Sequence, residues 1–113
     1  DLAGPGEIRD EGSLLAGPSG GKFLFGSSRY QMLDSMAVDS AGNVCVATLV
    51  NGGVTVISPD GASTDWVPTG DPFTTNICFG GPDLRTAFIT LSGSGKLVTM
   101  KWPRPGLKLH YNR

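Results

Sequence analysis

The side chain best suited to chemistry in this sequence is the carboxylate of Asp34, which lies in the segment Leu33-Asp34-Ser35-Met36. Carboxylate oxygens are preferred ligands of hard cations such as Ca²⁺, which take about 6–8 oxygen donors, so one aspartate supplies only part of such a site. The alternative is a turn-forming aspartate that hydrogen-bonds the local backbone before a strand. The residue types alone leave both interpretations of Asp34 open.

The elements around Asp34 are predicted to be short strands. β-rich runs alternate with turns made of Gly, Asn, Asp and Pro, and no segment of useful length has helical periodicity. The expected strands cover residues 36–39, 43–49, 53–58 and 64–68, and then 76–80, 86–91 and 96–102. The second series repeats the first at a spacing of roughly 42 residues, which is typical of propeller blades of about four strands. We therefore predict an all-β chain built of β-propeller blades.

The side chains of the best strand indicate that it is covered on both faces. Val44, Val46 and Thr48 point one way and Cys45, Ala47 and Leu49 the other, yet both sets are largely apolar. A solitary sandwich shows cleaner polar alternation, with one face exposed to water. The pattern favours a blade that packs between two neighbouring blades.

Length, composition and charge limit the classes of function. The 113 residues have room for one domain, and 17 glycines with 8 prolines agree with many short strands joined by turns. A formal net charge of −1 without runs of like charge argues against nucleic-acid and anionic-membrane partners. No apolar stretch approaches the ~18 residues needed to span a bilayer, and no leader pattern begins the chain. We expect a soluble, cytoplasmic protein that does not bind nucleic acid or membrane.

The other candidate residues are predicted to have structural roles. Asp39, Asp60 and Asp83 are expected to form turns, and Arg85 to face solvent. Cys45 and Cys78 lie in apolar runs without zinc or redox spacing, so we expect buried free thiols, although a disulfide between the two blades stays open. His110, the single histidine, lies in a tail expected to be exposed or loosely docked. A serine-histidine-aspartate triad is therefore not predicted.

Several motifs resemble one enzyme family. The Asp34 segment is followed by Ala37-Val-Asp-Ser-Ala-Gly-Asn43, by a Gly52-Gly53 turn and by Cys78-Phe-Gly-Gly-Pro-Asp83. In this order they resemble the closing blades of the senescence marker protein/gluconolactonase/luciferin-regenerating enzyme (SMP-30-like) family. The resemblance covers residues from about 33 to 102, and it implies a six-bladed propeller with a divalent metal in its central channel.

The resemblance also implies a function for the site. It suggests a metal-dependent hydrolase of sugar-type lactones, in which metal-activated water attacks the lactone. Asp34 matches the family's metal-ligand aspartate and is the expected catalytic residue, with Ca²⁺ as the favoured ion and Zn²⁺ or Mg²⁺ as alternatives. Ser35 stands where the family usually has glycine, and Asn76 holds the equivalent entry position of the next blade. Both are expected to contact substrate, although Asn76 also suits a turn cap.

The expected blades are too few to close a ring. Residues 31–68 are predicted to form one full blade and residues 73–103 most of the last blade. Residues 1–30 would then supply outer strands of a third, and residues 104–113 a C-terminal tail. An open pair of blades exposes sheet faces and edges. We expect the missing blades to come from a longer chain or from copies of this one; the alternative function is a non-catalytic propeller fragment that acts as a binding or assembly module.

Overall fold

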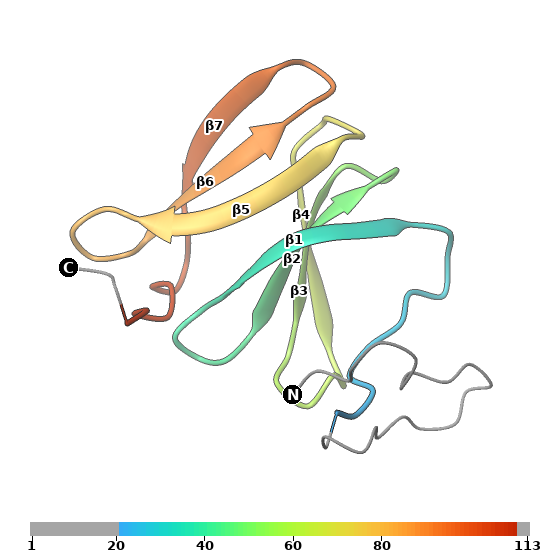
Figure 1. The fold of residues 1–113 in the computed structure, drawn as a ribbon, viewed down its shortest axis with the longest axis horizontal. Helices are drawn as coiled ribbons and strands as arrows, with labels where there is room; N and C mark the ends of the chain where they lie inside the picture. The colour runs from blue at the N-terminus through green and yellow to red at the C-terminus, as the bar shows by residue number, and fades with distance from the viewer. Residues whose placement is uncertain (1–20, 111–113) are drawn as a thin grey trace.

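Two antiparallel sheets make up the fold, which we analysed in a computed structural model that describes residues 21–110. The first sheet has the order β1-β2-β3-β4 and the second the order β5-β6-β7 (Figure 1). The strands of the first sheet are β1 (Met32–Val38), β2 (Val44–Leu49), β3 (Gly53–Ile57) and β4 (Thr64–Pro68). Those of the second are β5 (Thr74–Gly80), β6 (Thr86–Leu91) and β7 (Lys96–Lys101). The all-β prediction is confirmed.

The predicted repeat appears in the strand boundaries. β1 and β5 are each seven residues long, and β2 and β6 are each six. In both sheets the first strand interrupts its pairing with the second by an irregularity in register, between Leu33 and Met36 in β1 and between Thr74 and Asn76 in β5. The two sheets are thus copies of one supersecondary unit.

β5 is the element that joins the sheets, because it packs against both β1 and β2. Figure 1 shows β1 and β5 running side by side in the same direction, so the innermost strands of the two units are neighbours. This arrangement brings the segments that contain Asp34 and Asn76 to adjacent strands. It is the feature of the fold that positions the candidate site.

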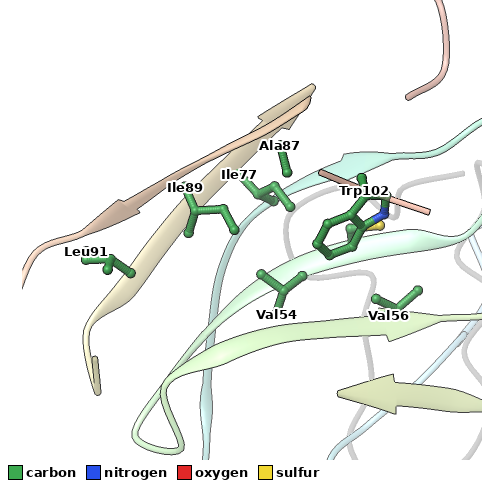
Figure 2. Packing of buried hydrophobic residues seen from close by; sticks show 8 residues of the cluster. Val54, Val56, Ile77, Ala87, Ile89, Leu91 and Trp102 are labelled. Carbon is green, nitrogen blue, oxygen red and sulfur yellow. The ribbon is translucent and has the colours of Figure 1, made fainter. Parts of the chain in front are cut away.

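The hydrophobic core fills the space between the sheets. β3 contributes Val54 and Val56, which face side chains from β5 and β6 (Figure 2). The buried cluster consists of Cys45, Val54, Val56, Ile77, Ala87, Ile89, Leu91 and Trp102. Trp102 is 1% exposed, and its ring lies 5.7 Å from that of Phe79, centroid to centroid. The prediction that both faces of β2 are covered also holds, since Cys45, Val46, Ala47 and Thr48 are all buried.

The first residues of the predicted C-terminal tail, 104–107, are anchored to both sheets, ahead of the part from Lys108 onward that was expected to be exposed or loosely docked. Arg104 Nε lies 2.7 Å from a carboxylate oxygen of Asp39. The backbone N–H of Gly106 donates to the carbonyl of Leu84, and that of Leu107 donates to the carbonyl of Val38. The sequence pattern missed this docking because it depends on contacts between residues far apart in the chain.

The N-terminal part matches the expected outer strands less well. Residues 21–31 contain no strand, and residues 1–20 lie outside the described residues. Leu33 and Phe25 line a hollow of about 830 Å³ on the side of the first sheet next to Trp66. The described part of the chain contains no helix, and therefore none that is long and apolar enough to cross a bilayer.

Candidate active site

Asp34 lies inside β1 rather than immediately before it, which corrects the strand boundary expected from sequence. Leu33 pairs with Thr48 and Met36 with Val46, so Asp34 and Ser35 together oppose a single residue of β2. This is the pattern of a β-bulge, in which an extra residue redirects side chains without ending the strand. Both residues are exposed. Within residues 21–110, no hydrogen bond or ion pair engages the Asp34 carboxylate.

Asn76 occupies a comparable place in β5. It follows the register irregularity after Thr74, and its side chain is exposed. Its Oδ1 accepts a hydrogen bond of 2.8 Å from the backbone N–H of Ile77, so the amide oxygen serves the local backbone. The side-chain NH₂ group is the part of Asn76 that is left to donate to a substrate. β5 itself begins at Thr74, two residues before the predicted start.

A cluster of hydroxyl groups beside Asn76 was not foreseen from the sequence. Thr75 Oγ1 lies 2.8 Å from Thr90 Oγ1 and 3.0 Å from Ser92 Oγ. The cluster exists because the irregularity at Thr75 turns its side chain toward the β6–β7 hairpin. The sequence held no signal for it beyond three scattered hydroxyl residues.

Asp71 has a structural role that the sequence analysis missed. Its Oδ1 accepts the N–H of Phe73 at 2.8 Å, and its Oδ2 accepts both the N–H and the hydroxyl of Ser94 at 2.8 Å. The hydrogen bond from Phe73 and those from Ser94 lower its pKa, despite the opposing effect of burial. Asp71 thereby ties the β4–β5 loop to the β6–β7 hairpin. The Gly70-Asp71-Pro72 sequence, typical of a turn, was the signal available.

Asp39 has a structural role, as predicted, but this role extends beyond the β1–β2 turn. Its carboxylate is fully buried and accepts hydrogen bonds from the backbone N–H groups of Ala41 and Asn43, from the Asn43 side chain and from Arg104. Burial alone raises the pKa of this carboxyl, but the Arg104 guanidinium and the other donors lower it below its ordinary value of 3.8. Asp39 is therefore ionised and engaged.

The remaining turn residues mostly agree with expectation. Asp60 accepts the hydroxyl of Ser58 at 2.7 Å, and Asp83 accepts the N–H of Arg85 at 3.1 Å. Arg85 differs from the solvent-facing side chain that we predicted. It is half-buried, and its Nη1 donates to the carbonyl of Pro103 at 2.7 Å, which helps to fix the chain after β7.

The two thiols differ in burial, and the single histidine lies far from them in the sequence. Both cysteines are free; Cys45 is buried as predicted, whereas Cys78 is exposed because it lies on the face of β5 that points away from the core. Burial, with a smaller effect of the nearby Asp39 charge, raises the pKa of Cys45 to about 12. His110 is exposed near the C-terminal end of the described residues, well past the last strand.

The donor set around Asp34 fits one ligand position of a metal site rather than a complete one. Among residues 21–110 there is no group of three or more His, Cys, Asp or Glu side chains that could hold a metal ion. A hard cation needs several further oxygen donors. Asp34 offers an exposed carboxylate for such a site, while Asp39 and Asp71 are already engaged by hydrogen bonds.

Comparison with known proteins gives consistent results. Residues 10–93 match the family described as SMP-30/Gluconolactonase/LRE-like region. A 6-deoxy-6-sulfogluconolactonase from Pseudomonas putida is 37% identical over 75 residues, which cover 65% of this chain and 26% of that protein.

A solved structure has the same fold over most of the chain. An X-ray structure of a proposed gluconolactonase superimposes with a TM-score of 0.65 and 29% sequence identity over 80% of this chain. The match covers 29% of the chain in that structure. The matched part of the present chain therefore covers less than a third of the length of either relative.

Proposed function

Because this chain belongs to the SMP-30/gluconolactonase/LRE-like family, we propose that it forms part of a metal-dependent lactone hydrolase that acts on sugar-type lactones. The observation that carries the proposal is the environment of Asp34. Its exposed carboxylate sits in a bulge of the innermost strand, and no interaction within residues 21–110 occupies it. Bulges are over-represented next to active sites, where they re-aim a side chain.

In the proposed mechanism, Asp34 supplies one oxygen ligand to a divalent cation, with Ca²⁺ favoured and Zn²⁺ or Mg²⁺ as alternatives. When bound, such an ion polarises a carbonyl and lowers the pKa of water. Asp34 also accepts the proton of the attacking water. The Ser35 hydroxyl and the Asn76 amide group donate hydrogen bonds to the hydroxyl groups of the substrate. The further oxygen donors that such an ion needs would come from other blades of the complete propeller.

The proposal requires those further blades to be present. They come from a longer polypeptide or from copies of this chain arranged around an axis. Light scattering of the 113-residue chain with and without Ca²⁺, together with a lactone hydrolysis assay, separates the two sources. A discrete active multimer supports assembly from copies, whereas an inactive monomer supports a longer polypeptide.

The decisive test of Asp34 uses the complete propeller. We expect Asp34→Ala to abolish metal-dependent hydrolysis of gluconolactone, measured by proton release, while the circular dichroism spectrum stays that of a β-protein. Asp83→Ala is the matched control, because Asp83 is also exposed but its carboxylate is engaged by the backbone N–H of Arg85 in the β5–β6 turn. If Asp34→Ala turned over lactone at the original rate, the proposed role would be wrong.

A second candidate function is a non-catalytic assembly module. The observation in its favour is the second sheet, which has three strands within the described residues and an exposed last strand. A complete propeller that binds its neighbours but hydrolyses no lactone at any metal concentration would favour this alternative.

A further inference from the structure

The turn between β2 and β3 contains the single Asn-Gly pair of the sequence, Asn51-Gly52. The Asn51 side chain is exposed, and within residues 21–110 no hydrogen bond or ion pair engages it. It lines the hollow of about 830 Å³ together with Arg29 and Trp66, so water reaches the amide and the side chain has room to change its rotamer. The Asn51 amide is therefore open to reaction.

The backbone that follows Asn51 suits an attack on this amide. Gly52 has no side chain to hinder its nitrogen, and its φ of 71° lies in the region that glycine adopts readily. Gly52 is buried, yet within residues 21–110 its N–H donates no hydrogen bond. Buried N–H groups are nearly always paired. The Gly52 nitrogen thus has no hydrogen bond to break before it reacts.

We propose that Asn51 is a site of spontaneous deamidation. The Gly52 nitrogen attacks the side-chain carbonyl carbon of Asn51 and loses its proton, while the bond to the side-chain NH₂ breaks and ammonia leaves. Water then opens the cyclic imide at either of its carbonyls, which leaves aspartate or isoaspartate. The net reaction is the hydrolysis of one amide and needs no oxidant or cofactor. The guanidinium of Arg29 in the same hollow favours the new carboxylate.

The consequence for the fold follows from how tightly this turn is packed. Val50 N–H donates to the carbonyl of Pro72 at 2.9 Å, and Thr69 N–H donates to the carbonyl of Gly52 at 3.1 Å. A Cβ placed on Gly52 would collide with the carbonyl oxygen of Asp71. Isoaspartate adds a methylene group to the backbone of this turn, so the β4–β5 loop must shift. That loop leads into β5, one of the strands that carry the candidate site. The deamidation itself does not depend on the lactonase proposal.

A comparable pair in the β3–β4 turn, Asp60-Gly61, is protected. Gly61 N–H donates to the carbonyl of Ser58 at 2.8 Å, and Asp60 Oδ1 accepts hydrogen bonds from the Ser58 hydroxyl and from the N–H of Ala62. Asp60→Asn therefore supplies a matched control, because it places an Asn-Gly pair in a turn where the glycine N–H is already engaged.

The test incubates the 113-residue chain at mildly alkaline pH, and peptide mapping by mass spectrometry follows the replacement of NH₂ by OH. We expect Asn51 to deamidate about tenfold faster than Asn43 and Asn76, whose side chains are hydrogen-bonded. Its rate should be similar in the folded chain and in the chain unfolded by urea. Asn51→Gln should remove the modification, because the longer side chain closes a less favourable ring.

The structural consequence has its own measurement. After chromatographic separation of the isoaspartate form, NMR hydrogen exchange should show the Thr69 amide exchanging about fivefold faster than in the unmodified chain. The Gly61 amide, which is bonded within the β3–β4 turn, should not change. Unchanged exchange at Thr69 would overturn the predicted shift of the β4–β5 loop.

Three results would overturn the deamidation site itself. They are equal rates at Asn51, Asn43 and Asn76, a rate at Asn51 that is much lower in the folded chain than in urea, and equal rates at positions 51 and 60 of the Asp60→Asn variant. The last would show that the unengaged N–H of Gly52 does not determine the reaction.

Discussion

The two sheets of this molecule share the same antiparallel strand order, but within residues 21–110 the first has four strands and the second has three. The first ends in β4, whose Asp65 and Pro68 suit an outer edge because proline cannot donate to a further strand. The second ends in β7, which occupies the place of β3 yet is exposed at nearly every position. The same kind of strand is thus buried in one sheet and open in the other. β3 lies between β2 and β4, whereas within residues 21–110 β7 pairs only with β6 and carries a lysine at each end.

The connection between the sheets relies on a polar clasp, defined as Asp39, Asn43 and Arg104. It joins the β1–β2 turn to the segment after β7, so it connects the first sheet to the chain that leaves the second. The carboxylate of Asp39 is fully buried, while the Arg104 side chain is 37% exposed. Removal of the carboxylate leaves its partly buried hydrogen-bond donors without this acceptor.

The largest expected effect comes from breaking this clasp. Asp39→Ala should lower the free energy of unfolding by about 2 kcal/mol, because Arg104, Asn43 and the backbone N–H groups of the turn lose their common acceptor. Guanidinium denaturation followed by tryptophan fluorescence measures the change, since Trp102 lies between the sheets. Asp83→Ala, at an exposed turn, is the control and should shift the midpoint little. An equal shift in both variants would mean that the clasp does not join the sheets.

The two cysteines allow a matched comparison of a buried position, Cys45, with an exposed one, Cys78. Cys45→Ser should destabilise the fold by about 2 kcal/mol, because it places a hydroxyl in the apolar core, whereas Cys78→Ser should be nearly neutral. In the native protein a thiol reagent should modify Cys78 and spare Cys45, whose pKa is raised to about 12 by burial. Mass spectrometry of the labelled peptides identifies the site. Rapid labelling of Cys45 would show that the sheets separate readily.

Much of this fold could be predicted from the sequence, because its signals are local. Turn residues bound each strand, and the repeat of roughly 42 residues predicted two similar units. The strands expected at 64–68 and 86–91 coincide with β4 and β6. The start of β1 was misplaced because a bulge lets a strand continue through a sequence, Leu33 to Met36, that has no clear alternation.

The site was predicted less completely, because its contacts are long-range. The carboxylate of Asp34 could be singled out, but the roles of Asp71 and Arg104 depend on residues 23 and 65 positions away. No local pattern marks which of several turn aspartates will meet an arginine from the far end of the chain. The exposure of Cys78 likewise depends on which face of β5 meets the first sheet.

A smaller effect is expected when acid protonates the carboxylates of Asp39 and Asp71. The folded-state pKa values of Asp39 and Asp71 are lowered, so the stability that each contributes is present above the unfolded value near 3.8 and is lost as pH falls through the folded value. Stability should therefore fall below about pH 4. The difference between the original protein and Asp39→Asn should be constant near neutral pH and shrink in this range. Denaturation curves at pH 7, 4 and 3 test this, and a constant difference would contradict it.

The smallest predicted effect concerns the turns at equivalent places in the two sheets. Val50, which follows β2, has a φ of 77°, a conformation that costs a β-branched residue about 1 kcal/mol. It is held there by a hydrogen bond from its N–H to the carbonyl of Pro72. Ser92, which follows β6, makes the corresponding bond to Phe73 without a left-handed φ.

Val50→Asn should therefore raise the free energy of unfolding by about 0.5–1 kcal/mol, since asparagine tolerates this region. Ser92→Asn should give no gain, because that position carries no comparable strain and its hydroxyl contacts Thr75. Thermal denaturation of both variants beside the original protein provides the measurement. An equal gain in the free energy of unfolding at Ser92 and Val50 would show that asparagine itself is stabilising. The backbone strain assigned to Val50 would then be wrong.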